Sequence, residues 1–406
     1  MIDGSLKSVL DDKKISKALI KNSVEKLNGN KRLFIISDHC DSRKPYSKKL
    51  ENLGKVRDLN SNIINGYTTL ESVTLDENKK ELTLSSISVQ SNKEPNFITK
   101  KELADYENGK IKNTHRVKEI AQMIEDDNYQ NISTVLYKHL QDQSKAYKAA
   151  NPNVSICHVH DRGCDSAEYL EFITDTLHDD AVVRAKKSRN SNQTKINPKT
   201  NRTIKVKLIE SKFKHQKVYL IDKMTMKGRH YSQVKCHIDW DTTIINEKEY
   251  SVVRVALIKR DGKPIHKEPM LLISTLKIAN YLDAKEIYHI YLHRAKIEGV
   301  FKFLKDTLGW EEYQVRDWES IKNIIAICFF IGGYFYEIHS ELTENETVQM
   351  ICNLARNKGK ITHHFFLEGL KLLLYAKHVE NFKKENNISS EMFKQMQAYA
   401  GIEEEI

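Results

Sequence analysis

The sequence predicts an α/β fold in which a mixed β-sheet carries helices and is interrupted by a β-rich insertion. Three observations in the 406-residue chain lead to this prediction. Short apolar runs that end at an aspartate, LFIIS (33–37) and VSICHVH (154–160), are typical of buried strands. Two alternating segments separated by polar residues predict a hairpin. Helical periodicity dominates from residue 283 nearly to the C-terminus, which predicts helices after the sheet.

The N-terminal part of the chain defines the first strands. Residues 1–31 are charged and helix-prone, so we expect a short helical segment there. The apolar run at 33–37 predicts the first strand, with Asp38 directly after it. GYTTLESVTLD (66–76) and KELTLSSISVQS (80–91) alternate between apolar and polar residues, and DENK lies between them. This pattern predicts a hairpin with a polar turn.

Helices and strands alternate in the next part of the chain. Asn-Pro-Asn at 151–153 ends a long helical pattern and precedes an apolar strand. Asp165 is expected to cap the helix that follows that strand. The predicted elements are helices at about 114–125 and 132–149, a strand at 154–160, a helix at 165–177 and a strand at 181–186.

A change of pattern at about residue 188 marks an insertion. Short alternating runs separated by Lys-, Asn- and Gly-rich loops extend to about 276 and predict a β-rich segment. The preceding order of strand, two strands, helices, strand, helix and strand is that of a ribonuclease H-like fold. The predicted organisation begins with an N-terminal helical segment (1–31) and the first part of the core (32–187). The insertion (188–276), a second part of the core with the helix that carries Glu298 (277–340) and a C-terminal helical region (341–406) follow.

The charge of the chain favours a polyanionic partner. The sequence contains 65 Lys and Arg residues against 55 Asp and Glu residues, for a net charge of +10. Between Arg184 and Lys217, Lys199 included, there are twelve basic residues and one acidic residue, Glu210. Such a run is the best candidate in the chain for contact with a DNA backbone. The longest apolar stretch, 324–336, is too short to span a bilayer and fits a buried helix. The six cysteines form no CxxC pair and the chain opens with charged residues, so we expect free thiols in a reducing cytoplasm.

Two aspartates and one glutamate are candidates for a metal site. Asp38 and Asp161 each follow a predicted strand, and ligand sites form at such strand ends. If the two strands are neighbours, the aspartates converge, and a helix carrying Glu298 could add a third carboxylate. Three carboxylates holding two Mg²⁺ ions would suit in-line attack on phosphate.

A second pattern supports this interpretation. In YLHRAKIEGVFKFLK (291–305), Tyr291, Arg294, Glu298 and Lys305 lie within about 60° of one another on a straight helix, and Lys302 lies beside them. A carboxylate flanked by cations and a phenol suits a metal beside a phosphodiester. The glutamate can bind a hard divalent cation, and the cations can hold phosphate oxygens.

This spacing resembles the YREK signature of bacterial insertion-sequence transposases, the insertion-sequence-four family of the DDE group. HDRGCDSAEYL (160–170) is similar to the family segment around the second catalytic aspartate, here Asp161, with Arg162 after it. IISDHCD resembles the strand of the first catalytic aspartate, for which Asp38 is the better candidate and Asp41 the fallback.

The resemblance also implies roles in DNA binding. VVRAK (182–186) is similar to a segment whose arginine, here Arg184, contacts DNA near the cut, and Lys302 matches a lysine near the scissile phosphate. Tyr291, Arg294 and Lys305 are implied to hold phosphates, with Arg162 in support. Well-studied relatives carry a base-stacking tryptophan where this chain has Met270, so a hairpin intermediate is less firmly implied than cleavage. The segment before Asp38 is shorter than in relatives, and we interpret it as a shortened DNA-recognition region.

The resemblance therefore implies a DNA transposase that cuts the ends of an insertion sequence and transfers the strand to target DNA. It implies two Mg²⁺ ions, which Mn²⁺ can replace, bound by Asp38, Asp161 and Glu298. The implied partners are double-stranded DNA and a second copy of the chain, in a bacterial cytoplasm near the nucleoid. Two alternatives stay open: a metal-dependent nuclease on the same scaffold, and a catalytically defective remnant that binds DNA.

Overall fold

The structure is a computed structural model that describes residues 11–58, 60–198, 200–226, 228–342, 346–355 and 361–399. Residues 1–10 of the predicted N-terminal segment, Lys199 of the basic run, and parts of the predicted C-terminal region lie outside these ranges. The chain divides into two compact units, Met1–Gly333 and Tyr334–Ile406. Each unit is described here by itself, and the five-part organisation expected from the sequence remains a prediction.

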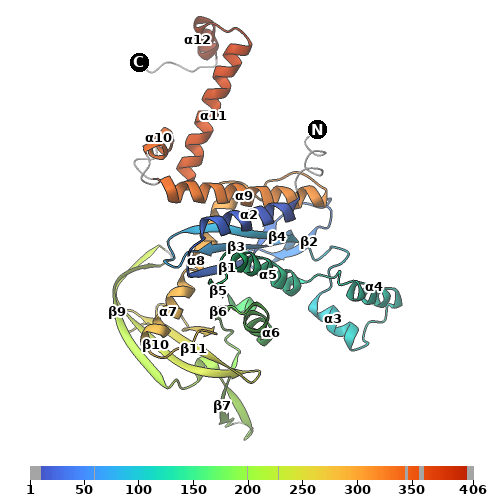
Figure 1. Cartoon of the computed structure of the whole chain (residues 1–406), viewed down its shortest axis with the longest axis vertical. Coiled ribbons are helices and arrows are strands. Elements are labelled where there is room, and N and C mark those ends of the chain that lie inside the picture. Colours follow the sequence, from blue (N-terminus) through green and yellow to red (C-terminus); the bar gives the residue numbers. More distant parts are fainter. Residues whose placement is uncertain are drawn as a thin grey trace. The chain divides into compact units, whose positions relative to one another are not determined.

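A mixed sheet forms the centre of the first unit (Figure 1). Its core strands are β1 (Arg32–Arg43), β3 (Ile63–Leu75), β4 (Leu82–Gln90), β5 (Ser155–His160) and β6 (Asp180–Arg184). The strand order is β4-β3-β1-β5-β6, in which β1 pairs antiparallel with β3 and parallel with β5, and β5 pairs parallel with β6. This mixed α/β arrangement agrees with the predicted ribonuclease H-like fold.

The first strand is longer than its apolar run. β1 continues through the polar residues after Ser37 because β3 supplies hydrogen-bond partners along its length, from Phe34 opposite Leu75 to Arg43 opposite Gly66. The expectation that Asp38 follows the strand is therefore wrong, since Asp38 lies within it. β5 ends at His160, with Asp161 directly after it, as predicted.

Helices cover the sheet near the predicted positions. The two predicted helices are α4 (Thr114–Glu125) and α5 (Ile132–Ala150), and α2 (Asp12–Lys26) lies in the N-terminal segment. The next helix differs from the prediction: α6 (Ala167–Glu171) continues into a π-helical turn, Phe172–Leu177. Its cap is Ser166, whose Oγ accepts a hydrogen bond from Tyr169 N at 3.2 Å. Asp165 instead accepts from Lys186 N at 2.6 Å and pairs with Arg189.

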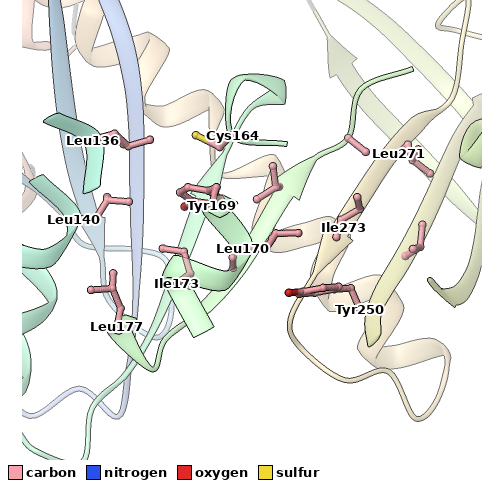
Figure 2. Packing of buried hydrophobic residues seen from close by; sticks show 14 of the residues in the cluster. Leu136, Leu140, Cys164, Tyr169, Leu170, Ile173, Leu177, Tyr250, Leu271 and Ile273 are labelled. Carbon is pink, nitrogen blue, oxygen red and sulfur yellow. The ribbon is translucent and has the colours of Figure 1, made fainter. Parts of the chain in front are cut away.

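The insertion extends the same sheet. It contains β9 (His215–Met226), β10 (Arg229–Ile245), β11 (Lys248–Ile258) and β12 (Met270–Ser274), and β12 pairs antiparallel with β6. The strands β7 (Asn190–Ile196) and β8 (Thr203–Lys207) form a separate two-stranded sheet. Figure 2 shows that one apolar cluster crosses the junction, from Leu140 of α5 through Tyr169 and Ile173 to Ile273 of β12. Shared packing therefore fixes β12 beside the core strands.

The start of the predicted helical region, expected to be one straight helix through Tyr291 and Lys305, is two helices. α7 (Tyr281–Leu292) and α8 (Ala295–Asp306) are separated by His293 and Arg294, where backbone hydrogen bonds close tighter turns, such as Arg294 N to the Tyr291 carbonyl at 3.0 Å. α8 packs against β1 and buries Ile297, Val300 and Leu304. The predicted apolar helix near 324–336 lies within α9 (Trp318–Leu342), where Ile325 and Phe329 are buried.

Three further features were not predicted individually. β2 (Gly54–Arg57) pairs with the start of β3, and α3 (Lys100–Glu107) precedes α4. In the second unit, α10 (Glu346–Leu354) packs on α11 (His363–Glu385), and α12 (Ser390–Tyr399) follows. A Cβ atom at Gly369 of α11 would lie 1.9 Å from the Ile351 carbonyl oxygen, so this contact requires glycine.

None of the helices in the described part of the chain combines the length and apolar character needed to cross a bilayer.

We expect the buried residue His139 to make the stability of the fold depend on pH. Burial, helped by the nearby His39, lowers the pKa of His139 to about 3, and hydrogen bonds join its ring to Ser72 and Ser88. The unfolded chain takes up a proton at this residue below about pH 6.5 and the folded chain does not, so stability falls as pH decreases. Between pH 7 and 5 we expect this residue to account for a loss of about 2 kcal/mol.

The measurement is urea unfolding at the two pH values for the parent and for His139→Gln. The variant removes the titrating ring and keeps hydrogen-bonding capacity, so its stability should depend less on pH by about that amount. An equal pH dependence in both proteins would contradict the assignment. Comparison of the pH-induced change, and not of absolute stability, removes the effect of any packing defect in the variant.

Candidate active site

Three elements bring the predicted acidic residues together. β1 and β5 are parallel, with Ile36 beside Val159, and extension of this register by two residues puts Asp38 beside Asp161. Glu298 lies in the first turn of α8, which packs against β1. Residues that are far apart in sequence thus meet at one edge of the core.

Arg294 connects two of these carboxylates. One guanidinium nitrogen contacts Asp38 Oδ2 at 3.0 Å, and the other contacts Glu298 Oε1 at 2.5 Å. The Asp38 and Arg294 side chains are mostly buried, at 18% and 17% exposed, whereas that of Glu298 is 61% exposed. Because Arg294 lies between the two helices, the turn there aims its side chain back at the sheet.

Burial dominates the electrostatics of Asp38. It raises the pKa of Asp38 to about 6, and the negative charges of Asp161 and Glu298 act in the same direction. The positive charge of Arg294 opposes this rise. A further cation next to such a carboxylate stabilises its charged form, because the cation offsets both the cost of burial and the repulsion between the acids.

Local hydrogen bonds orient Asp161. Its side chain caps the 3₁₀ turn Arg162–Cys164 and accepts a hydrogen bond from Gly163 N at 2.7 Å. The cap leaves the second carboxylate oxygen available for another partner. The turn also starts at Arg162, which places a guanidinium beside the aspartate.

A cavity of about 380 Å³ opens at this edge. Its walls carry acidic, basic and apolar side chains from β6, β12 and the junction of α7 and α8. The lining residues are Asp161, Arg162, Arg184, Met270, Tyr291, Leu292, Arg294, Ala295 and Glu298. Seven of these are residues that the sequence singled out. Burial raises the pKa of Tyr291, and the nearby charges of Arg294 and Arg184 oppose that rise.

The two predicted lysines of α8 lie outside the cavity lining. Lys302 is exposed. Lys305 donates to the Asp41 carbonyl at 2.7 Å and pairs with Glu311 at 3.2 Å. The idea that a single straight helix aligns Tyr291 with the other motif residues is wrong, since the break at Arg294 puts Tyr291 on α7. The pair of Arg294 and Glu298 persists because a spacing of four residues spans one helical turn.

The structure separates the two candidates for the first aspartate. Asp41 is three residues beyond Asp38 in the same strand, so its side chain points to the opposite face of the sheet. Its carboxylate accepts from Arg57 N at 3.3 Å and Thr68 Oγ1 at 3.4 Å, away from Arg294. Asp38 is therefore the aspartate that meets Asp161 and Glu298.

Two acidic residues near the site were not foreseen. The Glu311 carboxylate forms ion pairs with Arg43, at 3.3 Å, and with Lys305, at 3.2 Å. Glu71 of β3 lies directly opposite Asp38 in the β1–β3 ladder. No local sequence motif identifies either residue as part of a site. The one available signal is that a glutamate is unusual in a predicted buried strand such as 66–76.

The acidic residues suit a hard divalent cation by chemistry. Carboxylate oxygens are the ligands that Mg²⁺ and Mn²⁺ prefer. Among the described residues, no three His, Cys, Asp or Glu side chains are near enough to one another to hold a metal ion in the present arrangement. Asp38 and Glu298 instead share the guanidinium of Arg294, which shows that both can reach one positive group.

Similarity to known proteins supports a functional meaning for this geometry. A family model described as a transposase DDE domain matches residues 139–331. The matched segment includes Asp161, Arg184, Arg294 and Glu298, whereas Asp38 precedes it. A comparison with curated proteins gave no match. The part of the chain from 139 to 331 is thus similar to transposase DDE domains, and the ribonuclease H-like fold is consistent with that similarity.

Proposed function

We propose that the protein is a transposase that cuts DNA at the ends of an insertion sequence and joins the freed 3′-hydroxyl to target DNA. The observation that carries this proposal is that Arg294 bridges Asp38 and Glu298, with Asp161 beside Asp38 in register, at a cavity lined by arginines. The similarity of residues 139–331 to transposase DDE domains supports the same conclusion.

The acidic residues would hold two Mg²⁺ ions, for which Mn²⁺ can substitute. When bound, such ions activate the attacking oxygen and stabilise the leaving oxygen of the phosphodiester. Asp38 and Asp161 come from rigid neighbouring strands, and Glu298 comes from the exposed first turn of α8. Binding of the ions requires Arg294 to release the carboxylates, which frees its guanidinium for a phosphate oxygen.

Basic residues around the cavity would bind the DNA backbone. Arg162, Arg184 and Arg294 line it, and Arg162 Nε is buried with no hydrogen-bond acceptor among the residues that the structure describes. A buried donor that lacks a partner gains from an anionic acceptor such as phosphate. Tyr291 adds a phenol to the same wall, and Lys302 and Lys305 extend the positive charge along α8. Met270 would contact a base more weakly than an aromatic ring.

Several basic residues of the insertion already form ion pairs within the protein, so they are only partly available to bind DNA. Arg189 pairs with Asp165, Lys195 with Glu210 at 3.5 Å and Lys214 with Asp241 at 3.5 Å. The Arg189–Asp165 pair is largely buried, whereas Lys195 and Lys214 are exposed, so DNA phosphates can compete for these two lysines. We propose that the insertion adds non-specific backbone contacts to those of the cavity.

A second copy of the chain would complete the active assembly. Transposition joins two DNA ends, which two active sites can bring together. In the second unit, α11 exposes Leu374 and Tyr375, each 69% exposed, and apolar side chains of this kind favour contact between helices of two copies. This unit is the proposed dimerisation region.

The test is a strand-transfer reaction with the full chain, Mg²⁺ and DNA that carries the terminal sequence flanking its reading frame. The proposal expects nicked ends followed by joined products of higher mass. Cut ends without joined products would instead favour a metal-dependent nuclease. Binding without any cutting, at several Mg²⁺ and Mn²⁺ concentrations, would favour the DNA-binding remnant and overturn the proposed activity.

A further inference from the structure

Glu71 faces the proposed active site from the neighbouring strand. It is the residue of β3 directly opposite Asp38 in the antiparallel β1–β3 ladder. Directly opposed residues of antiparallel strands project from the same face of the sheet, with their Cβ atoms roughly 5 Å apart. The Glu71 side chain therefore shares its face with Asp38, the face to which Arg294 reaches.

The Glu71 carboxyl group is buried and poorly satisfied by hydrogen bonds. The residue is 0% exposed, and neither carboxyl oxygen has a hydrogen-bond partner among the described residues. Thr69 and Lys305 lie near enough to influence the carboxyl group, but Thr69 Oγ1 donates to the Cys40 carbonyl at 2.8 Å and Lys305 to the Asp41 carbonyl. Burial raises the pKa of Glu71 well above its ordinary value; Thr69 and Lys305 oppose this rise, and the charge of Asp38 adds to it.

The strand changes its pairing next to Glu71. The register between β3 and β4 shifts between Ser72 and Val73, which marks a β-bulge or a similar irregularity. Such irregularities re-aim side chains and are common beside active sites. On the opposite face, Ser72 Oγ forms a hydrogen bond with His139 of α5 at 2.8 Å, which holds the strand on the side away from Asp38 and Glu71.

Packing gives no reason for a glutamate at this position. A buried polar group without a partner destabilises a fold, and an apolar residue of the same size would avoid that penalty. Residues that lower stability in this manner are characteristic of functional sites. Glu71 shares its face of the sheet with Asp38, where a divalent cation is expected.

We propose that Glu71 is a fourth oxygen donor of the divalent-cation site, acting beside Asp38 on the same ion. The proposal rests on the metal-dependent function proposed above and adds a residue to it. Asp38, Asp161 and Glu298 provide one carboxylate each, and Mg²⁺ or Mn²⁺ takes about six oxygen ligands, so a further donor from the protein has a place in the coordination sphere.

The test compares Mn²⁺ binding and thermal unfolding of the full chain with those of Glu71→Gln and Glu71→Leu. Mn²⁺ affinity is measured by electron paramagnetic resonance titration. Both variants are expected to bind Mn²⁺ roughly 10–100-fold more weakly. Without metal, the leucine variant should unfold at the same temperature as the parent or about 2 °C higher, because it buries no unpaired carboxyl. A merely structural role predicts the reverse, a lower unfolding temperature with unchanged Mn²⁺ affinity.

Two controls separate the possible failures. Asp41→Asn alters a carboxylate of β1 on the opposite face and should leave Mn²⁺ affinity unchanged. Asp38→Asn should weaken Mn²⁺ binding. If Asp38→Asn weakens binding and both Glu71 variants bind as the parent does, the role of Glu71 is wrong and the proposed function stands. If Asp38→Asn also has no effect, the cation site itself is wrong. The glutamine and leucine side chains differ in polarity. If one of the two variants does not fold, the Mn²⁺ affinity of the other still tests the role of Glu71.

Discussion

Replacement of Glu298 by glutamine is expected to slow DNA cleavage by about 10³-fold, because a neutral amide is a poor ligand for a divalent cation. A cation at the scissile phosphate contributes several kcal/mol to the transition state, and each 1.4 kcal/mol corresponds to a factor of ten in rate. Glu298 is 61% exposed and its ion pair spans one turn of α8, so the loss of stability should stay below about 1 kcal/mol. The measurement is single-turnover cleavage of DNA carrying the element end.

Asp306→Asn is the matched control for this experiment. Asp306 is the last residue of the same helix and is exposed, so its replacement removes one negative charge without touching the proposed site. We expect it to cleave at the parental rate. Cleavage by Glu298→Gln within a few-fold of the parent, with normal folding in both variants, would remove this carboxylate from the reaction.

The sequence predicted the main strands well because burial and alternation are local signals. The runs at 66–76 and 80–91 became β3 and β4, and the apolar run at 154–160 became β5. The end of β1 was missed for a physical reason. Its second half is polar, and only the long antiparallel partner β3 makes an extended conformation favourable there.

A periodic apolar pattern does not show at which residue a helix begins or ends. Asp165 and Ser166 are both good caps, and the structure uses Ser166 because Lys186 N and Arg189 take the Asp165 carboxylate. The break between α7 and α8 leaves the apolar periodicity almost unchanged, so the sequence does not reveal it. Its consequence is large, since the turn at Arg294 directs that side chain toward Asp38.

Part of the site could be foreseen because its residues recur at helical spacing or follow a strand. Arg294 and Glu298 are four residues apart, and Asp161 follows an apolar run. Glu71 could not be foreseen, because its relation to Asp38 depends on the register of two strands that no local pattern fixes. Lys305 has the expected spacing, yet its contacts with Asp41 and Glu311 come from segments distant in sequence.

Replacement of Arg294 by glutamine is expected to reveal competition between its guanidinium and divalent cations. Without metal, the variant leaves Asp38 and Glu298 without their shared positive charge, at a cost of about 1–3 kcal/mol, intermediate between exposed and buried ion pairs. Added Mg²⁺ should stabilise the variant more than the parent, because in the parent the cation must first displace the guanidinium. The measurement is the unfolding temperature of both proteins over a Mg²⁺ titration.

DNA cleavage by the same variant should nevertheless fall by about 10²–10³-fold, since a positioned cationic donor to the reacting phosphate is lost. Tighter cation binding together with slower cleavage distinguishes this role from simple support of the fold, which would weaken both. Lys296→Gln is the control, because Lys296 is also at the start of α8 but donates to the Lys79 carbonyl and to no carboxylate of the site. If Mg²⁺ raises the unfolding temperature of the parent and of Arg294→Gln equally, Arg294 does not share its carboxylates with the cation, and its contacts with Asp38 and Glu298 are purely structural.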